Sequence, residues 1–202
     1  MQNRLLFLTF GLGLMATTMS ANATVIWEDL FARADNDTVG NSWVEVESSD
    51  RKVKLKDEQL WLTDRSADSS ATRNGIDLAG FEDIKVVFTW APKSTESGDT
   101  FFVAVQIPDD TWSNIFSTGL GGVESFATTT IDLGDLGLVA DNVTGLGLWF
   151  GAGQFNGRGE RVMITSVQIL GTAIGSVVTT SSPVSGTINI PEPATLGLFG
   201  LA

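Results

Sequence analysis

The sequence contains no cysteine, no histidine and no tyrosine. Without cysteine, the chain can form no disulfide bond, no zinc–thiolate site and no thiol nucleophile. Without histidine, it lacks the general base of a Ser-His-Asp centre and the imidazole ligands of many metal sites. Basic residues are also few, because 12 Lys and Arg stand against 24 Asp and Glu, for a net charge of −12. An acidic chain does not neutralise phosphates, so we expect no nucleic-acid partner.

The N-terminus predicts a secretory signal peptide over residues 1–23. Arg4 supplies the positive charge, residues 5–16 form an apolar run, and Ala21-Asn22-Ala23 is a small-x-small cleavage site. The apolar run is shorter than the about 20 residues that a membrane-spanning helix needs. We therefore expect signal peptidase to cut before Thr24, rather than leave the run as an anchor, and the mature chain to be exported.

The C-terminal part consists of two predicted segments. Residues 171–190 are rich in Thr, Ser and Gly, which is typical of a flexible linker. Residues 191–202 begin with Pro191-Glu192-Pro193 and continue with small residues and leucines. The nine residues after Pro193 are too few to cross a membrane. We therefore expect the natural chain to continue beyond Ala202.

Together with the signal peptide, this ending resembles the PEP-CTERM sorting signal. The resemblance implies that an exosortase processes the chain in a Gram-negative bacterium that makes exopolysaccharide. It also implies a transient membrane association through a C-terminal helix, which in this family ends in a cluster of Arg. The final location would be the cell surface or the extracellular matrix. The alternative is that residues 191–202 are an exposed proline-rich tail.

The pattern of apolar residues over 24–170 predicts one all-β domain, an antiparallel β-sandwich or barrel. Apolar residues recur there with period two, which is typical of strands with one buried face. The predicted strands are residues 53–56, 60–62, 84–90, 101–107, 146–150 and 162–170, the last with a bulge near Thr165 and Ser166. Turn-forming residues separate these runs at residues 74–75, 97–99, 108–110, 119–122 and 156–157. Neither an amphipathic helix nor a fixed repeat is evident, which favours a sandwich over a solenoid.

The order of aromatic and glycine-containing segments narrows the type of sandwich. These segments are residues 25–31 (VIWEDLF), 40–43 (GNSW), 81–90 (FEDIKVVFTW), 98–103 (GDTFFV), 109–112 (DDTW), 143–150 (VTGLGLWF) and 162–171 (VMITSVQILG). The series resembles secreted jelly-roll modules of the galactose-binding-like and LamG-like groups. That resemblance implies a jelly-roll sandwich, and such modules are often carbohydrate-binding or adhesive and often bind calcium.

Catalysis without histidine or cysteine would need paired carboxylates, as in glycosidases. Glu45 and Glu47 lie two residues apart on one face, and Asp109 and Asp110 lie in a predicted turn. Neither pair stands in a recognisable catalytic motif. We expect Glu45 and Glu47 to form a solvated strand face and the protein to have no catalytic residues.

Calcium binding is predicted at acidic loop residues, because calcium takes six to eight oxygen ligands. Asp35 and Asp37 alternate with other oxygen-bearing side chains before Gly40, but Val46 stands where an EF-hand would place glutamate. The site would therefore be irregular, with Glu28, Asp29 or Glu160 as further ligands. The alternatives are a turn whose side chains cap their own backbone and acidity that serves solubility.

Tryptophan is the candidate for sugar contact, because an aromatic face stacks on the apolar face of a pyranose. Of six tryptophans, Trp90 shares the phase of core residues, whereas Trp149 is out of phase with Leu148 and Phe150. Trp112 follows the acidic turn at residues 108–110. The predicted ligand-binding residues are Trp112, Trp149, Asn156 and Arg158. Burial in the core is the alternative for each tryptophan.

Three functions are consistent with these patterns. The first is an exported, non-catalytic module that binds extracellular polysaccharide and has calcium as its predicted cofactor. The second is a glycan-active hydrolase or lyase of sandwich fold. The third is a structural protein of the biofilm matrix without a specific ligand.

Overall fold

The computed structural model describes residues 23–47, 52–63, 69–108, 111–121, 124–155, 157 and 159–175. The predicted signal peptide before Ala23, residues 176–202 with the Pro191-Glu192-Pro193 motif, and the candidates Asn156 and Arg158 lie outside the described residues. Within the described part of the chain, no helix is long and apolar enough to cross a membrane.

The described chain forms eleven strands and one short 3₁₀ turn. They are β1 (Thr24–Asp29), β2 (Trp43–Val46), β3 (Val53–Lys56), β4 (Gln59–Leu62), β5 (Ser69–Asp77), β6 (Phe81–Lys93), β7 (Thr100–Gln106), β8 (Ser113–Gly119), β9 (Ala127–Asp132), η1 (Gly134–Leu136), β10 (Thr144–Gly153) and β11 (Arg161–Ala173). The last strand extends three residues into the segment that the sequence predicts as linker.

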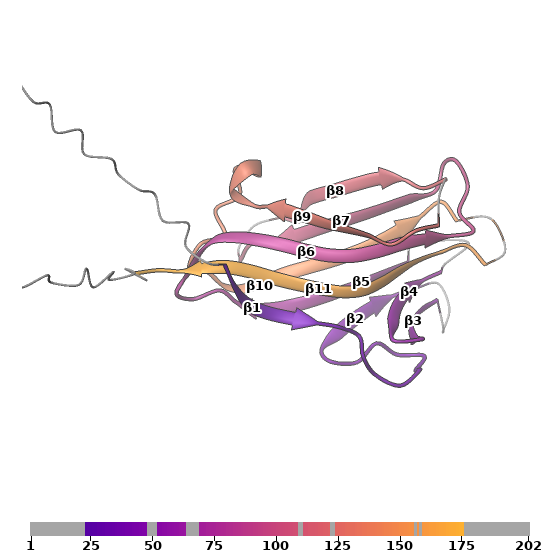
Figure 1. The fold of residues 1–202 in the computed structure, drawn as a ribbon, viewed down its shortest axis with the longest axis horizontal. Coiled ribbons are helices and arrows are strands. Elements are labelled where there is room, and N and C mark those ends of the chain that lie inside the picture. Colours follow the sequence, from indigo (N-terminus) through magenta and orange to yellow (C-terminus); the bar gives the residue numbers. More distant parts are fainter. Residues whose placement is uncertain are drawn as a thin grey trace, which may run out of the picture.

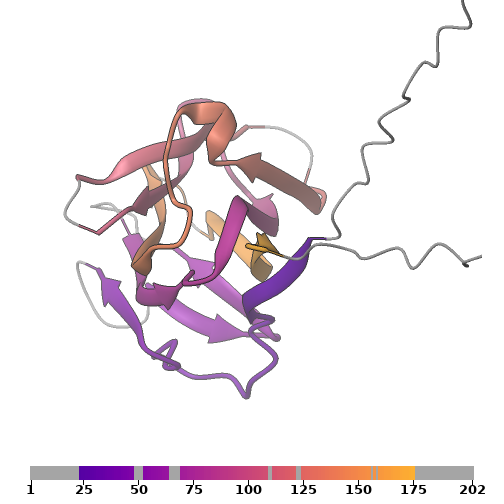
Figure 2. The ribbon, with the colours of Figure 1, turned by 90° about the vertical axis from the view of Figure 1, so that its left-hand side faces the viewer.

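The strands form two antiparallel sheets that pack face to face (Figures 1 and 2). One sheet has the order β3-β4-β11-β6-β9, and the other has the order β2-β5-β10-β7-β8. Strand β1 joins the first sheet, because it pairs with β11 beyond the end of β4, along the same edge of β11. The first sheet is therefore six-stranded and the second is five-stranded. The order β4-β11-β6-β9 facing β5-β10-β7-β8 is that of an eight-stranded jelly roll. The predicted all-β sandwich of jelly-roll type is confirmed.

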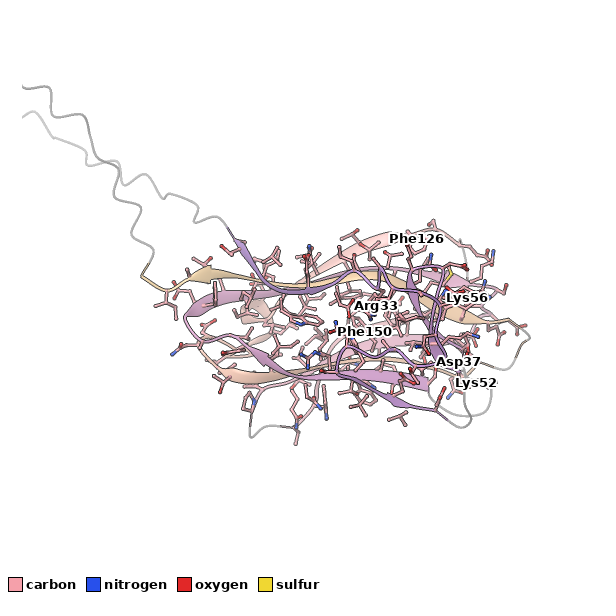
Figure 3. The ribbon with its side chains drawn as sticks, turned by 90° about the horizontal axis from the view of Figure 1, so that it is seen from below. Arg33, Asp37, Lys52, Lys56, Phe126 and Phe150 are labelled. Atoms are coloured by element: carbon pink, nitrogen blue, oxygen red, sulfur yellow. The ribbon has the colours of Figure 1, made fainter. Side chains whose placement is uncertain are left out.

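The core lies between the sheets and is rich in aromatic rings. On β10, Leu146, Leu148 and Phe150 are fully buried. The Phe150 ring lies between the two layers (Figure 3), 5.7 Å from the ring of Phe88 and 6.2 Å from that of Phe101. Period-two alternation buries one face of each strand, and the predicted alternation is confirmed here.

The structure differs from the sequence prediction at polar strands. Strands β5 and β9 carry mostly Ser, Thr, Asn and Asp, so that they lack the apolar alternation used for prediction. The predicted turn at Asn74-Gly75 is wrong, since both residues lie inside β5. There the register with β10 shifts and Gly75 has a φ of +74°, which indicates a bulge. The same residues that favour turns also favour bulges. The bulge predicted near Thr165 and Ser166 is confirmed by a register shift between β11 and β6.

Candidate functional site

Trp149 lies on the outer face of the five-stranded sheet. It points away from the core because its neighbours Leu148 and Phe150 are fully buried. Gly147 and Gly151, two residues away on either side, face outward with it and carry no side chain. On the outer face of β10, one large ring therefore lies between two positions that carry no side chain.

Two further aromatic rings fill the space over these glycines. The Phe102 ring packs edge-on against Trp149, with centroids 5.1 Å apart, and a Cβ on Gly151 would overlap it. The Trp112 ring lies 5.7 Å from that of Trp149, and a Cβ on Gly147 would come within 3.0 Å of it. We call Phe102, Trp112 and Trp149 the aromatic strip. All three residues are half-buried.

Neutral polar groups flank the aromatic strip. The cross-strand neighbours of Trp149 are Thr72 on β5 and Ala104 on β7. The Asn74 side chain reaches over Gly147, where its Oδ1 would lie 3.0 Å from an added Cβ. Amide and hydroxyl groups beside an apolar ring can donate to and accept from the hydroxyls of a sugar that stacks on that ring.

The structure brings together two of the four residues predicted for ligand binding, Trp112 and Trp149. It adds Phe102, which the sequence prediction missed. The signal was available: Phe102 is out of phase with the buried Phe101 and Val103, as Trp149 is on β10. What the sequence could not give is the register that places Phe102 directly opposite Gly151.

Asp29, predicted as a calcium ligand, is buried and surrounded by hydrogen-bond donors. Its Oδ1 accepts from the Phe31 amide at 2.8 Å and from Arg33 Nη1 at 2.7 Å. Its Oδ2 accepts from Asn41 Nδ2 at 3.0 Å and from Trp43 Nε1 at 2.9 Å. Burial raises the pKa of Asp29, but these hydrogen bonds together outweigh burial and hold the pKa below its usual value. The carboxylate therefore ties the loop after β1 to β2.

The other predicted calcium ligands are not gathered around Asp29. Glu28 accepts from Gln168 at 3.1 Å, and Asp35 accepts from the Asp57 amide at 2.8 Å. The buried Glu160 accepts from the Gly157 amide. Asp37 lines an open pocket with Asp35. In the described ranges, no group of three or more Asp or Glu side chains could hold a metal ion. Calcium binding stays a prediction.

Glu45 and Glu47 do not form the solvated strand face that the sequence predicts. Glu45 accepts a hydrogen bond from the Val39 amide, and Glu47 accepts from the amides of Lys52 and Val53 at 2.6 and 2.7 Å. Burial raises the pKa of Glu45, the Val39 bond lowers it, and the Glu47 charge raises it further, for a net rise. Both carboxylates hold neighbouring loops in place, because unpaired backbone amides are costly once buried.

Comparisons with known proteins give distant structural neighbours. No protein-family model and no curated protein matches the chain. TmCBM61 in complex with β-1,4-galactotriose is similar at 12% identity, over 64% of this chain and 88% of that one, with a TM-score of 0.45. CBM29_1, a family 29 carbohydrate-binding module from Piromyces equi, is similar at 12% identity, over 75% and 91%, with a TM-score of 0.43.

The secreted serine protease VesC from Vibrio cholerae is similar over 55% of this chain, at 14% identity and a TM-score of 0.38. The chain spans 21% of VesC and 19% of a bacteriophage CBA120 tailspike that is also similar. Binding modules and parts of larger proteins thus both occur among the neighbours. The fold assignment itself rests on the strand order described above.

Proposed function

We propose that the protein is an exported, non-catalytic module that binds extracellular polysaccharide through the aromatic strip. The single observation that supports this most is the pair of indole rings, Trp112 and Trp149, that pack together half-buried on the outer face of a sheet. The outer face of a sandwich is usually polar, so large rings held there by packing and bordered by amides suit a ligand with apolar faces and hydroxyl edges. Several structural neighbours bear the name of carbohydrate-binding modules, but the proposal rests on the strip.

The neutral surroundings of the strip support binding rather than turnover. Hydrolysis of a glycosidic bond needs a carboxylic acid and a carboxylate on either side of that bond. Asp109 and Asp110, which precede Trp112, lie outside the described residues. The cross-strand partners of Trp149 are Thr72 and Ala104, and those of Phe102 are Gly151 and Ser117, so none of these described neighbours is acidic. A ligand chain on this face would therefore meet hydroxyl and amide groups.

Export is the second part of the proposal. Its support is the predicted signal peptide over residues 1–23 and the resemblance of residues 191–202 to the PEP-CTERM sorting signal. Processing by an exosortase would then deliver the domain to the surface or matrix of a Gram-negative cell. Cell fractionation with Glu192→Ala tests this, since retention of the variant in the cell is expected and unchanged delivery would contradict it.

The binding experiment uses the purified chain and a panel of neutral β-linked hexasaccharides of glucose, galactose, mannose and xylose. We expect at least one to bind, and Trp112→Ala to weaken that binding about tenfold, because a stacked ring contributes about 1–2 kcal/mol. Phe126→Ala is the matched control, since Phe126 is an exposed ring (47%) outside the strip.

Four other outcomes would each contradict the proposal. Release of reducing ends from the panel would favour the hydrolase, and new unsaturated ends would favour the lyase. Silence of the whole panel would favour a structural matrix protein. Equal losses in the Trp112 and Phe126 variants would remove the strip as the binding surface.

A further inference from the structure

The outer face of the six-stranded sheet carries three cations around one indole ring. Trp61 lies on β4 and points outward, because the residues on either side of it are fully buried. The guanidinium carbon of Arg161 is 4.2 Å from the centroid of the Trp61 ring. Lys54 Nζ and Lys56 Nζ are 5.8 and 5.7 Å from it. We call Lys54, Lys56 and Arg161 the cationic cluster.

Strand register gathers this cluster from distant parts of the sequence. Lys54 on β3 pairs directly opposite Trp61, and Met163 on β11 pairs opposite Trp61 on the other side. Arg161, two residues before Met163, therefore lies on the same face. The ring holds the cations by cation–π contacts, each worth about 0.5–2 kcal/mol.

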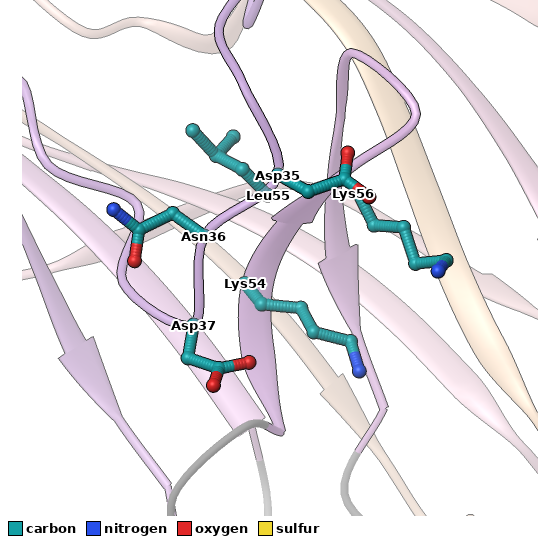
Figure 4. A pocket seen from close by; sticks show the side chains of 6 residues that line it. All are labelled: Asp35, Asn36, Asp37, Lys54, Leu55 and Lys56. Carbon is teal, nitrogen blue, oxygen red and sulfur yellow. The ribbon is translucent and has the colours of Figure 1, made fainter.

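No ion pair among the described residues includes a member of the cationic cluster. The described ion pairs join Arg33 to Asp29, Lys85 to Asp132 and Lys93 to Glu124. Acidic residues outnumber basic ones two to one in this chain, so carboxylates were available as partners. Asp35 and Asp37 lie beside the two lysines (Figure 4), and the charges of Glu124 and Asp57 act on Arg161, but none of these carboxylates forms a described ion pair with the cluster. The ammonium and guanidinium groups are therefore available as donors to a bound anion.

A pocket of about 330 Å³ adjoins the cluster (Figure 4). Its lining residues are Asp35, Asn36, Asp37, Lys54, Leu55 and Lys56. This volume lies at the lower end of the range of small-molecule binding sites, which is about 300–1,000 Å³.

An edge bridge orders the side chains of this pocket. Asn36 and Leu55 exchange backbone hydrogen bonds of 3.1 and 2.9 Å. Because side chains alternate along a strand, the residues that flank Asn36 face those that flank Leu55. Figure 4 shows this arrangement, with Asp35 beside Lys56 and Asp37 beside Lys54. The pocket thus offers both carboxylate oxygens and ammonium groups.

We propose that the cationic cluster and the adjoining pocket bind a uronate residue of an acidic polysaccharide. The uronate carboxylate accepts hydrogen bonds from Lys54, Lys56 and Arg161, which are donors only. Its ring hydroxyls donate to the carboxylates at the pocket edge. An acidic peptide and a polyphosphate chain both lack this set of vicinal hydroxyls. The site is independent of the aromatic strip, which lies on the other sheet.

The test is calorimetric titration of the full chain with oligogalacturonate and with the same oligomer as its neutral methyl ester. We expect the acid form to bind and the ester to bind about tenfold more weakly, because the ester loses the charge-assisted bonds. Lys56→Gln and Arg161→Gln should each weaken binding of the acid form by about the same factor. Added salt should weaken it further.

Lys85→Gln is the matched control, since it removes one positive charge from the same sheet. Lys93 on β6 pairs with Arg161 on β11. Lys85 lies eight residues from Lys93 along β6, a distance of about 26 Å at the usual rise per residue of a strand. Three results would each overturn the proposal. The first is equal affinity for the acid and the ester, and the second is an equal loss of affinity in Lys85→Gln and Lys56→Gln. The third is binding of single-stranded DNA in place of oligogalacturonate. Loss in Trp112→Ala with none in Lys56→Gln would also overturn it, while leaving the aromatic strip as a binding site.

Discussion

Replacing Asp29 by alanine should destabilise the domain strongly, although Asp29 lies outside both proposed binding sites. Its carboxylate accepts four hydrogen bonds, and two of the donors, the Phe31 amide and Trp43 Nε1, are buried. Each buried donor left without an acceptor costs about 1–3 kcal/mol. The Asn41 and Arg33 donors lie nearer solvent and can turn to water, so they add less. The expected loss is about 4 kcal/mol.

The backbone at Phe31 adds to this expectation. Phe31 has a φ of +53°, a conformation that costs a bulky residue about 1–2 kcal/mol. The hydrogen bond from its amide to Asp29 holds that conformation and seats the Phe31 ring 5.8 Å from the ring of Trp43. Asp29→Ala therefore removes the restraint on a strained residue as well as an acceptor.

Thermal unfolding measures the effect. For a domain of this size, each 1 kcal/mol shifts the melting temperature by about 2–4 °C, so Asp29→Ala should lower it by about 8–16 °C. Asp35→Ala is the matched control, because this exposed carboxylate accepts one backbone hydrogen bond. A drop in Asp29→Ala no larger than that in Asp35→Ala would mean that the buried donors do not depend on Asp29.

The pH dependence has a defined sign. The pKa of Asp29 is lower in the folded protein, so its stabilising effect is complete above the ordinary carboxyl pKa and is lost as pH falls through the lowered value. The difference in melting temperature between the natural chain and Asp29→Ala should therefore shrink in strong acid. A difference that stays constant down to that range would mean that the charge of Asp29 is not what stabilises the loop.

Two further predictions concern Gly151 and Glu45. Gly151→Ala should displace the Phe102 ring, lower the free energy of unfolding by about 1–3 kcal/mol and weaken sugar binding at the aromatic strip. Gly119→Ala is the control, because the space around Gly119 is open, and it should have none of these effects. Equal melting temperatures of the two variants would contradict the close packing of Phe102 on Gly151. The pKa of Glu45 is raised, so its ionisation opposes folding as pH rises through that range. Glu45→Gln keeps an acceptor for the Val39 amide but cannot ionise. Its melting temperature relative to that of the natural chain should therefore rise from acid to neutral pH. Melting curves at acid and at neutral pH that show the same difference between the two proteins would contradict this prediction.

The sequence predicted the architecture where burial is one-sided and apolar. Apolar residues alternate along β6 from Ile84 to Phe88, along β7 from Phe101 to Val105 and along β10 from Leu146 to Phe150, and these residues are buried as the alternation predicts. Near the end of β6 the phase shifts, so that Ala91 is buried and Trp90 is only half-buried. Strand β5 escaped prediction because its polar residues carry no period, and pairing with β2 and β10 on either side makes it a strand. Tertiary pairing overrides local propensity there.

The candidate site could be predicted in part, because apolar alternation also shows which residues face outward. Trp149 is recognisable as outward because it breaks the phase of a buried strand, and the glycines around it mark where other rings approach. Sequence cannot reveal that Trp112 lies against Trp149, because this contact depends on how the segment before β8 crosses the sheet. The separation of Asp29 from the other predicted calcium ligands is likewise a property of the folded chain, in which four donors occupy its carboxylate.

The cationic cluster shows why total charge is a poor guide to local charge. An excess of acidic residues excludes a large basic face, but it sets no limit on where the few basic residues gather. In β3 the pattern Val-Lys-Leu-Lys places both lysines on the outer face, since the two apolar residues are buried. Antiparallel pairing then lays Trp61 beside them and β11 brings Arg161 to the same ring. The net charge of the chain does not report this local arrangement, because strand register and alternation determine which charges lie together. The proposed affinity of this face for an anion therefore follows from the register and not from the net charge.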